Sequence, residues 1–320
     1  MPAHGSKRVI YAALIGNSLI AVTKFAAAAY TGSSAMLSEA VHSVVDTGNQ
    51  GLLLYGMRRA RKPADAEHPF GHGREIYFWA FVVAILIFGL GAGISFYEGI
   101  VNIRDPHPIT SPLVNYIVLG AAFIFELIAW IVAFREFRKV KGKAGYLTAV
   151  RRSKDPALFT VLFEDSAAML GLITAFAGVV LAVELDMPWL DGAASIGIGL
   201  VLATAAAFLA YECKGLLIGE SAGPEVAAGI REIVRDKPAI RAINELRTLH
   251  FGPDDILLAV SVDFLDEVTA GTVESTISAM ERQIKAAFPA VKRLFIEVQS
   301  AEDHQASVAR SRAARRALSD

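Results

Sequence analysis

The chain has 320 residues, of which 54% are hydrophobic and 20% charged, and its mean hydropathy is positive at +0.44. This balance is typical of a membrane protein with a polar portion. A net charge of −1 gives no basis for binding nucleic acid, and the single cysteine, Cys213, excludes a disulfide framework or a multi-cysteine zinc site within one chain.

Six apolar segments approach or exceed the length needed to cross the ~30 Å hydrocarbon core of a bilayer. They lie near residues 9–30, 35–57, 76–103, 113–134, 157–183 and 190–218. The third contains Gly89, Gly91 and Gly93, which favour a bend or the close approach of another helix. The first eight residues lack the features of a cleavable signal peptide or a mitochondrial presequence, so we expect a bacterial inner-membrane protein.

The connections between these segments differ in charge. Those after the second and fourth segments are rich in Lys and Arg, whereas TGSS, RDPHPITSP and ELDMPWLD on the opposite side hold one Arg and no Lys. Because positively charged loops stay inside, we expect a multi-pass protein with both termini in the cytoplasm.

The polar part of the chain begins near residue 219. GPEVAAGIREIVRDKP and TVESTISAMERQIKAAF have helical patterns, and FGPDD separates two strand-like runs as a plausible hairpin. With VKRLFIEVQ as a third strand, the order αββαβ predicts a small two-layer α+β domain with its helices on one face of the sheet. We therefore divide the chain into a six-helix membrane region, 1–218, this α+β domain, 219–300, and a basic tail, 301–320, which is flexible or loosely helical.

Ionisable residues interrupt two of the apolar segments. His42 and Asp46 lie in the second, and Glu164 and Asp165 lie in the fifth. A charge at bilayer depth costs roughly 2.5–3.5 kcal/mol on insertion scales, so it usually marks an ion or proton path. His42 and Asp46 are four residues apart, on one face of a helix, and imidazole with carboxylate suits Zn²⁺ and other first-row divalent ions. The sequence predicts a metal transport site.

Glu164 and Asp165 cannot both point straight at one centre, because neighbouring residues are ~100° apart around a helix. Asp165 takes that place if the fifth segment packs on the second. Glu164 is then an extra ligand, a proton carrier or a group that supports a ligand. The alternative is a hydrogen-bond network that joins helices without transport, although such networks favour amides and hydroxyls over three acids.

A second cluster lies in the loop after the second segment, where DAEHPFGH brings Asp65, His68 and His72 within eight residues. Two histidines and an acid can close around one Zn²⁺, and Pro69 and Gly71 permit a tight turn. On spacing alone, a solvated loop explains these residues as well as a metal site does.

Other polar residues are scattered through the apolar segments. We expect Lys24 and Glu126 to pair with another group or to reach an interface, and Asn17, Asn49 and Gln50 to hydrogen-bond across helices. His107 lies in an outer loop beside two prolines, where solvation explains it.

Together these motifs resemble the cation diffusion facilitator family of divalent-metal/proton antiporters, and the branch that contains mitochondrial zinc exporters. The matching stretches are TKFAAAAYTGSSAMLSEAVHSVVDTGNQ, HPFGHGREIYFWAF and LFEDSAAMLG, followed by the αββαβ domain, over about residues 9–300. The resemblance implies a six-span bundle, a metallochaperone-like (ferredoxin-like) cytoplasmic dimerisation domain, and a homodimer that exports metal in exchange for protons.

The resemblance also implies site residues. His42, Asp46 and Asp165 match transport-site ligands, whereas Val161 stands at the position of the usual fourth ligand, for which Glu164 is the natural substitute. Asp65, His68 and His72 match the family's loop metal site.

Some bacterial relatives place a binuclear zinc site in the tail domain. This chain has Asn244, Val260, Ile296 and Val298 there, so we expect no such site and dimerisation by packing.

The sequence thus predicts a non-enzymatic Zn²⁺/H⁺ antiporter that works by alternating access. Zn²⁺ is its substrate and a candidate structural ion, no organic cofactor is expected, and the partners are a second copy, divalent metal ions, protons and the lipid bilayer. Mn²⁺, Fe²⁺ and Co²⁺ stay open as cargo, because geometry contributes to selectivity. The rival classes are a membrane metalloenzyme, for which no HExxH motif is present, and a metal-sensing protein without flux.

Overall fold

A computed structural model of the chain describes residues 3–109, 111–141 and 145–317. It forms two compact units, of which the first spans the chain up to Ala64 and from Arg74 to Leu217. The second comprises Asp65–Gly73 and the chain from Ile218 onward. The loop with the second candidate metal cluster therefore belongs with the C-terminal unit, which the sequence analysis did not anticipate.

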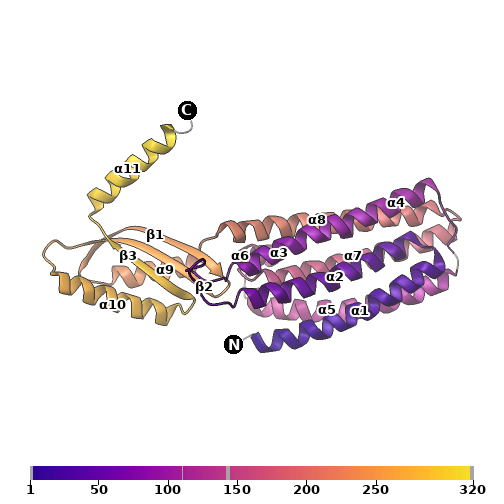
Figure 1. The fold of residues 1–320 in the computed structure, drawn as a ribbon, viewed down its shortest axis with the longest axis horizontal. Helices are drawn as coiled ribbons and strands as arrows, with labels where there is room; N and C mark the ends of the chain where they lie inside the picture. The colour runs from indigo at the N-terminus through magenta and orange to yellow at the C-terminus, as the bar shows by residue number, and fades with distance from the viewer. Residues whose placement is uncertain (1–2, 110, 142–144, 318–320) are drawn as a thin grey trace. The chain divides into compact units, whose positions relative to one another are not determined.

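Long helices build the first unit (Figure 1). They are α1 (Ala3–Thr31), α2 (Ser34–Arg59), α3 (Glu75–Leu86), α4 (Gly93–Arg104), α5 (Pro112–Lys141), α7 (Pro156–Glu184) and α8 (Trp189–Ile218), with a π-helical turn η1 (Ile87–Ala92) and a short α6 (Tyr146–Arg152). Each of the six predicted spans is thus helical, with α3, η1 and α4 forming the third.

Four helical stretches are long and apolar enough to cross a membrane among the residues the structure describes. They are Glu75–Arg104, Pro112–Lys139, Phe159–Glu184 and Trp189–Ile218. The second predicted span, α2, is more polar, because Glu39, Asp46, Asn49 and Gln50 lie along it.

The helices α1, α2, α7 and α5 form a closed bundle, since α1 packs on α2, α2 on α7, α7 on α5 and α5 on α1. The predicted site residues of α2 and α7 therefore belong to adjoining helices. Outside this bundle, Gly99 of α4 and Gly192 of α8 allow a close helix approach, because a Cβ at Gly99 would lie 2.7 Å from the Gly192 carbonyl oxygen.

The third span contains the irregularity that its glycines predict. The π-helical turn Ile87–Ala92 includes Gly89 and Gly91, and Gly93 begins α4. A π-turn inside an α-helix is a local insertion that is frequent at functional sites.

A buried carboxylate fixes the start of α2. Asp191, in the first turn of α8, is 0% exposed and accepts hydrogen bonds from Ser33 Oγ (2.7 Å), Ser34 N (2.6 Å) and Ala35 N (3.3 Å). The first N–H groups of a helix have no partner within it, and the helix dipole favours an anion there. Asp191 therefore ties the beginning of α8 to the beginning of α2.

We expect Asp191→Ala to lower the free energy of unfolding by about 2–4 kcal/mol, because several charge-assisted hydrogen bonds are lost and buried N–H groups lose their acceptor. Thermal unfolding of the detergent-solubilised protein measures this. Asp186→Asn, at an exposed position of the same connection, is the control. A control-like melting temperature for Asp191→Ala would contradict the anchoring role.

The second unit has the predicted αββαβ order. Its elements are α9 (Pro224–Arg235), β1 (Ile240–Gly252), β2 (Asp255–Phe264), α10 (Ala270–Ala287) and β3 (Val291–Val298), followed by α11 (Ala301–Ala317). The sheet order is β1-β2-β3, with β1 and β2 antiparallel and β2 and β3 parallel, as the hairpin and the α10 crossover require. The tail is helical through Ala317, and residues 318–320 lie outside the described chain.

Both helices of this domain share one core on the sheet. Every second residue of β2 is buried in it, namely Ile256, Leu258, Val260, Val262 and Phe264. Because side chains alternate along a strand, these residues point to one face, where they meet Ile230 and Val234 of α9 and Met280 and Ile284 of α10. This confirms the two-layer arrangement predicted from the sequence.

Candidate metal sites

The candidate transport site lies between α2 and α7. His42, Asp46, Glu164 and Asp165 are 1%, 4%, 4% and 7% exposed. His42 Nε2 lies 3.4 Å from Asp46 Oδ2, as expected for residues one helical turn apart. The structure thus brings the imidazole and the carboxylate of α2 together.

Glu164 of α7 contacts α2 close to Asp46. Asn49 Nδ2 donates a hydrogen bond of 2.6 Å to Glu164 Oε1, so the expected link across helices is present for Asn49. The carboxyl groups of Glu164 and Asp46 also lie within hydrogen-bonding reach of each other. Asp165, the next residue, is buried about 100° further round α7.

Several polar atoms at this site lack a hydrogen-bond partner within the described chain. They include both ring nitrogens of His42, Asp46 Oδ1 and Gln50 Oε1. Buried polar atoms are normally satisfied by protein, water or an ion, so these atoms are available to bind an ion. Imidazole nitrogen and carboxylate oxygen are ligands for a first-row divalent ion, so the chemistry of these side chains suits such an ion. Among the described residues, however, the structure brings three such ligand atoms within 4.8 Å of one another only at the loop cluster.

Val161, one turn before Asp165 on α7, packs against the hydrophobic core and supplies no ligand atom. The position that the resemblance gives to a fourth ligand is therefore apolar. Glu164 is the acid that can replace it, because it already faces Asp46.

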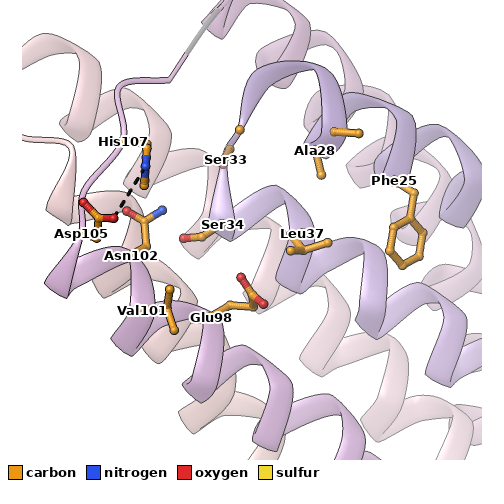
Figure 2. Close-up of a pocket in the computed structure, with 12 residues that line it drawn as sticks. Phe25, Ala28, Ser33, Ser34, Leu37, Glu98, Val101, Asn102, Asp105 and His107 are labelled. Carbon is orange, nitrogen blue, oxygen red and sulfur yellow. Dashed lines mark ion pairs between the residues drawn. The ribbon is translucent and has the colours of Figure 1, made fainter.

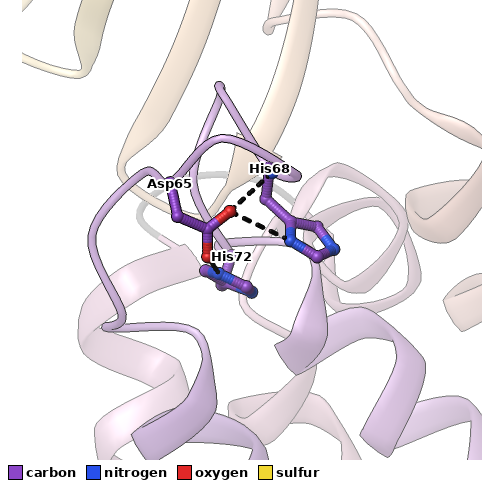
Figure 3. Close-up of side chains that lie close together, drawn as sticks. All are labelled: Asp65, His68 and His72. Carbon is purple, nitrogen blue, oxygen red and sulfur yellow. Dashed lines mark hydrogen bonds and ion pairs between the residues drawn. The ribbon is translucent and has the colours of Figure 1, made fainter.

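The structure brings the three residues of the loop cluster together (Figure 3). Asp65 Oδ2 lies 2.9 Å from His72 Nε2, and Asp65 Oδ1 lies 3.3 Å from His68 Nδ1 and accepts a 2.6 Å hydrogen bond from the His68 N–H. One ligand atom from each residue lies within 4.8 Å of the other two. Gly71 has φ +76°, a turn conformation that glycine adopts without strain.

The electrostatics of the loop cluster favour an ionised carboxylate. The hydrogen bond with His72 and the backbone N–H of His68 lower the pKa of Asp65 to about 2. Because the pKa of Asp65 is lower in the native loop than in the unfolded chain, its ionised carboxyl group stabilises the native loop at pH values above the ordinary carboxyl pKa. This stabilisation is lost as the pH falls towards 2. The Asp65 carboxyl group is therefore ionised at every physiological pH.

The loop is held against the strands of the C-terminal unit. The Phe70 ring stacks on Phe251 with centroids 5.1 Å apart, and Arg293 Nη2 donates a 2.7 Å hydrogen bond to the Phe70 carbonyl oxygen. Arg293 Nη1 also donates to Asp255 Oδ1 at 2.6 Å. A Cβ at Gly73 would lie 2.4 Å from the Phe251 carbonyl oxygen, so Gly73 is required for this approach.

A pocket of about 280 Å³ lies near the start of α2, among α1, α2 and α4 (Figure 2). Glu98, Asn102, Asp105 and His107 line one side of it. His107 is 69% exposed and lies 3.9 Å from Asp105, which agrees with the solvated loop expected from the sequence.

The sequence does not fully predict two buried networks. Lys24 was expected to pair but without a named partner, and the structure pairs it with Glu39 and Ser43. From the sequence, Asp191 is assigned only to the connection ELDMPWLD. The signal for its role is the Ser33–Ser34 pair at the start of one helix and the acid at the start of another, because both residue types cap helices.

Comparison with known proteins supports a transport role for this arrangement. The family model described as the cation efflux transmembrane domain matches residues 10–218. The human "Proton-coupled zinc antiporter SLC30A9, mitochondrial" is 35% identical over 263 residues, which are 81% of this chain and 46% of that protein. The chain thus spans about half the length of the first curated relatives it matches.

Two further relatives come from a plant and a bacterium. "Metal tolerance protein C4" of Arabidopsis thaliana is 29% identical over 81% of this chain and 57% of its own length. "Cation-efflux pump FieF" of Cronobacter sakazakii is 26% identical over 88% of this chain and 89% of its own. A solved nickel form of the MamM C-terminal domain covers 24% of this chain and 98% of its own at 18% identity, with a TM-score of 0.23, too low to bear on function.

We expect the double substitution His68→Ala and His72→Ala to lower the zinc bound per chain by about one ion, because two of three loop ligands are removed. Substantial transport should persist, since the loop cluster shares no residue with the buried site. Metal analysis of purified protein and flux into vesicles measure these quantities, with His107→Ala as the matched control. Unchanged zinc content would contradict the loop site, and complete loss of flux in a folded protein would contradict its separation from transport.

Proposed function

Because the chain belongs to the cation efflux family, we propose that it exports a divalent metal ion, chiefly Zn²⁺, from the cytoplasm in exchange for protons. The observation that carries the proposal is the facing pair of Asp46 and Glu164 beside His42, buried between α2 and α7. The names of the human and bacterial relatives, a zinc antiporter and a cation-efflux pump, agree with it.

The geometry makes metal and protons competitors. Two neighbouring buried carboxyl groups repel each other when both are ionised, and either a proton or a metal ion relieves this repulsion. A divalent ion binds the deprotonated groups and removes that repulsion, and protons arriving from the other side displace it. His42, with both ring nitrogens unsatisfied within the described chain, supplies a neutral ligand that protonation also removes.

In this proposal His42, Asp46, Glu164 and Asp165 form the transport site, which opens alternately to the two sides of the membrane. Asp65, His68 and His72 hold a second zinc ion in the loop that stabilises the protein. The proposal involves no chemical conversion and no organic cofactor.

The proposal places both termini in the cytoplasm of a bacterial cell and the protein in its inner membrane, because the Lys- and Arg-rich connections lie on the side of the termini. It includes a homodimer formed by packing of the C-terminal domains. Phe295 of β3 is 56% exposed, which supports an apolar contact there.

A transporter of the same class with Mn²⁺, Fe²⁺ or Co²⁺ as cargo uses the same ligands, and a metal sensor binds without flux. Flux measurements in proteoliposomes separate the proposals. An antiporter moves metal and protons in opposite directions, and the rank of competing metals identifies the cargo.

We expect Asp46→Ala or Asp165→Ala to abolish metal flux and to leave a folded dimer, because each removes an anionic ligand from a site that lacks one at Val161. The fluorescence of a zinc-sensitive dye inside proteoliposomes measures the flux, and size-exclusion chromatography checks that the dimer is folded. Asp186→Asn is the control, since that side chain is exposed. Flux at the wild-type rate in either alanine variant would remove that residue from the site.

Glu164→Gln separates the two roles open to Glu164. If Glu164 is a ligand, the substitution should weaken zinc binding at least tenfold at every pH, because an amide oxygen binds Zn²⁺ far less well than a carboxylate. If Glu164 only carries protons, the substitution should leave zinc binding at high pH intact and flatten the pH dependence of transport. Because Glu164 contacts Asp46, we expect the first outcome.

Calorimetric zinc titrations at pH 6 and pH 8 measure the difference, with Glu184→Gln at the exposed end of α7 as control. Unchanged affinity together with an unchanged pH dependence would reject both roles.

A further inference from the structure

A buried ion pair lies beside the candidate transport site. Lys24 of α1 and Glu39 of α2 both have side chains that are 0% exposed. Lys24 Nζ lies 3.0 Å from Glu39 Oε2 and 2.9 Å from Ser43 Oγ, within the α1–α2 contact. The ammonium is therefore held at a fixed place in the interior of the bundle.

That place is within one helical turn of the transport site. Ser43 follows His42 directly and precedes Asp46 by three residues, and Glu39 precedes His42 by three. Residues three and four apart share a helix face, so Glu39, His42, Ser43 and Asp46 form one polar stripe along α2. Lys24 meets this stripe on the side nearer the start of α2.

The ion pair uses only one of the two carboxylate oxygens of Glu39. One carboxylate oxygen of Glu39 binds Lys24, whereas the other, Oε1, has no hydrogen-bond partner in the described part of the chain. This free oxygen lies against α7, where a Cβ at Gly171 would come within 2.3 Å of it. Glu39 therefore reaches the same α2–α7 interface that holds Asp46 and Glu164.

A contact that served only to hold α1 against α2 would not need charged residues. Desolvating a buried ion pair can cost more than its attraction returns, and well-packed apolar residues often replace such pairs without loss of stability. A positive charge near a cation site has a direct consequence, because a divalent ion is repelled twice as strongly as a monovalent one at the same distance.

We propose that Lys24 is a tethered cation that weakens the transport site for its divalent ion, with Glu39 as the opposing charge that limits this effect. The pair sets an affinity at which the ion is captured and still released. Lys24 acts through its charge as a positioning residue and does not touch the ion. The inference rests on the proposed function only in locating the ion at His42, Asp46 and Glu164.

The two charges must have opposite effects on affinity. In Lys24→Met the repulsion is removed while Glu39 stays, so zinc should bind about tenfold more tightly and leave more slowly, which lowers turnover. In Glu39→Gln the ammonium is uncompensated, so zinc should bind about tenfold more weakly. The double variant should return to within about threefold of the wild type, and Lys24→Arg, which keeps the charge, should stay in that range.

Calorimetric titration of the full chain in detergent with Zn²⁺ alone measures these affinities, and vesicle flux measures turnover. Lys214→Met, an exposed lysine on α8, is the matched control and should leave both unchanged. To keep the loop cluster out of the titration, every variant carries His68→Ala and His72→Ala.

If the Lys24–Glu39 pair only holds α1 against α2, the variants should show different changes in affinity and melting temperature. If both single variants weaken zinc binding, or if affinities stay within threefold while melting temperatures fall, the proposal is overturned. Should either single variant fail to fold, the double variant and Lys24→Arg decide, because a tenfold change in either contradicts the charge effect. A wild-type protein that binds zinc but moves none would overturn export and leave the affinity shifts to decide the role of Lys24.

Discussion

The first unit depends on an imbalance of buried charge. The α1, α2, α5 and α7 bundle buries five acidic side chains, Glu39, Asp46, Glu126, Glu164 and Asp165, and one lysine, Lys24, among the described residues. Ionised groups are costly in a medium of low polarity unless they are paired. The acids in excess of Lys24 must therefore hold protons or a metal ion. In the proposed transporter, this requirement is what allows a metal ion to exchange with protons.

The surrounding packing keeps the acids where they compete. The Asp191 carboxylate fixes the start of α2, and the hydrogen bond from Asn49 to Glu164 ties the middle of α2 to α7. Between these two points lie Lys24, Glu39 and His42, so the polar stripe of α2 is fixed at both ends. The third span is built differently, because its π-helical turn interrupts the regular helix and offers a place where the chain can bend.

The parts of the structure that local spacing determines were predictable from the sequence. His42 and Asp46 share a helix face because they are four residues apart, and Asp65, His68 and His72 meet because a glycine permits the turn between them. The choice between Glu164 and Asp165 was not, since it depends on how α7 is rotated against α2. The pairing of Lys24 with Glu39 also depends on the packing of two helices, which hydropathy does not encode.

The two candidate metal sites differ in solvent exposure, and this decides which can couple metal to protons. Asp65 is 52% exposed, and its histidine contacts lower its pKa to about 2, so its carboxyl group does not take up a proton at physiological pH. At the buried site, Asp46 and Glu164 face each other without solvent, so their carboxyl groups can exchange protons for metal. A loop with a permanently ionised ligand suits an ion that stays, whereas a site with closely spaced, desolvated acids suits an ion that leaves. The proton dependence of transport should therefore originate between α2 and α7.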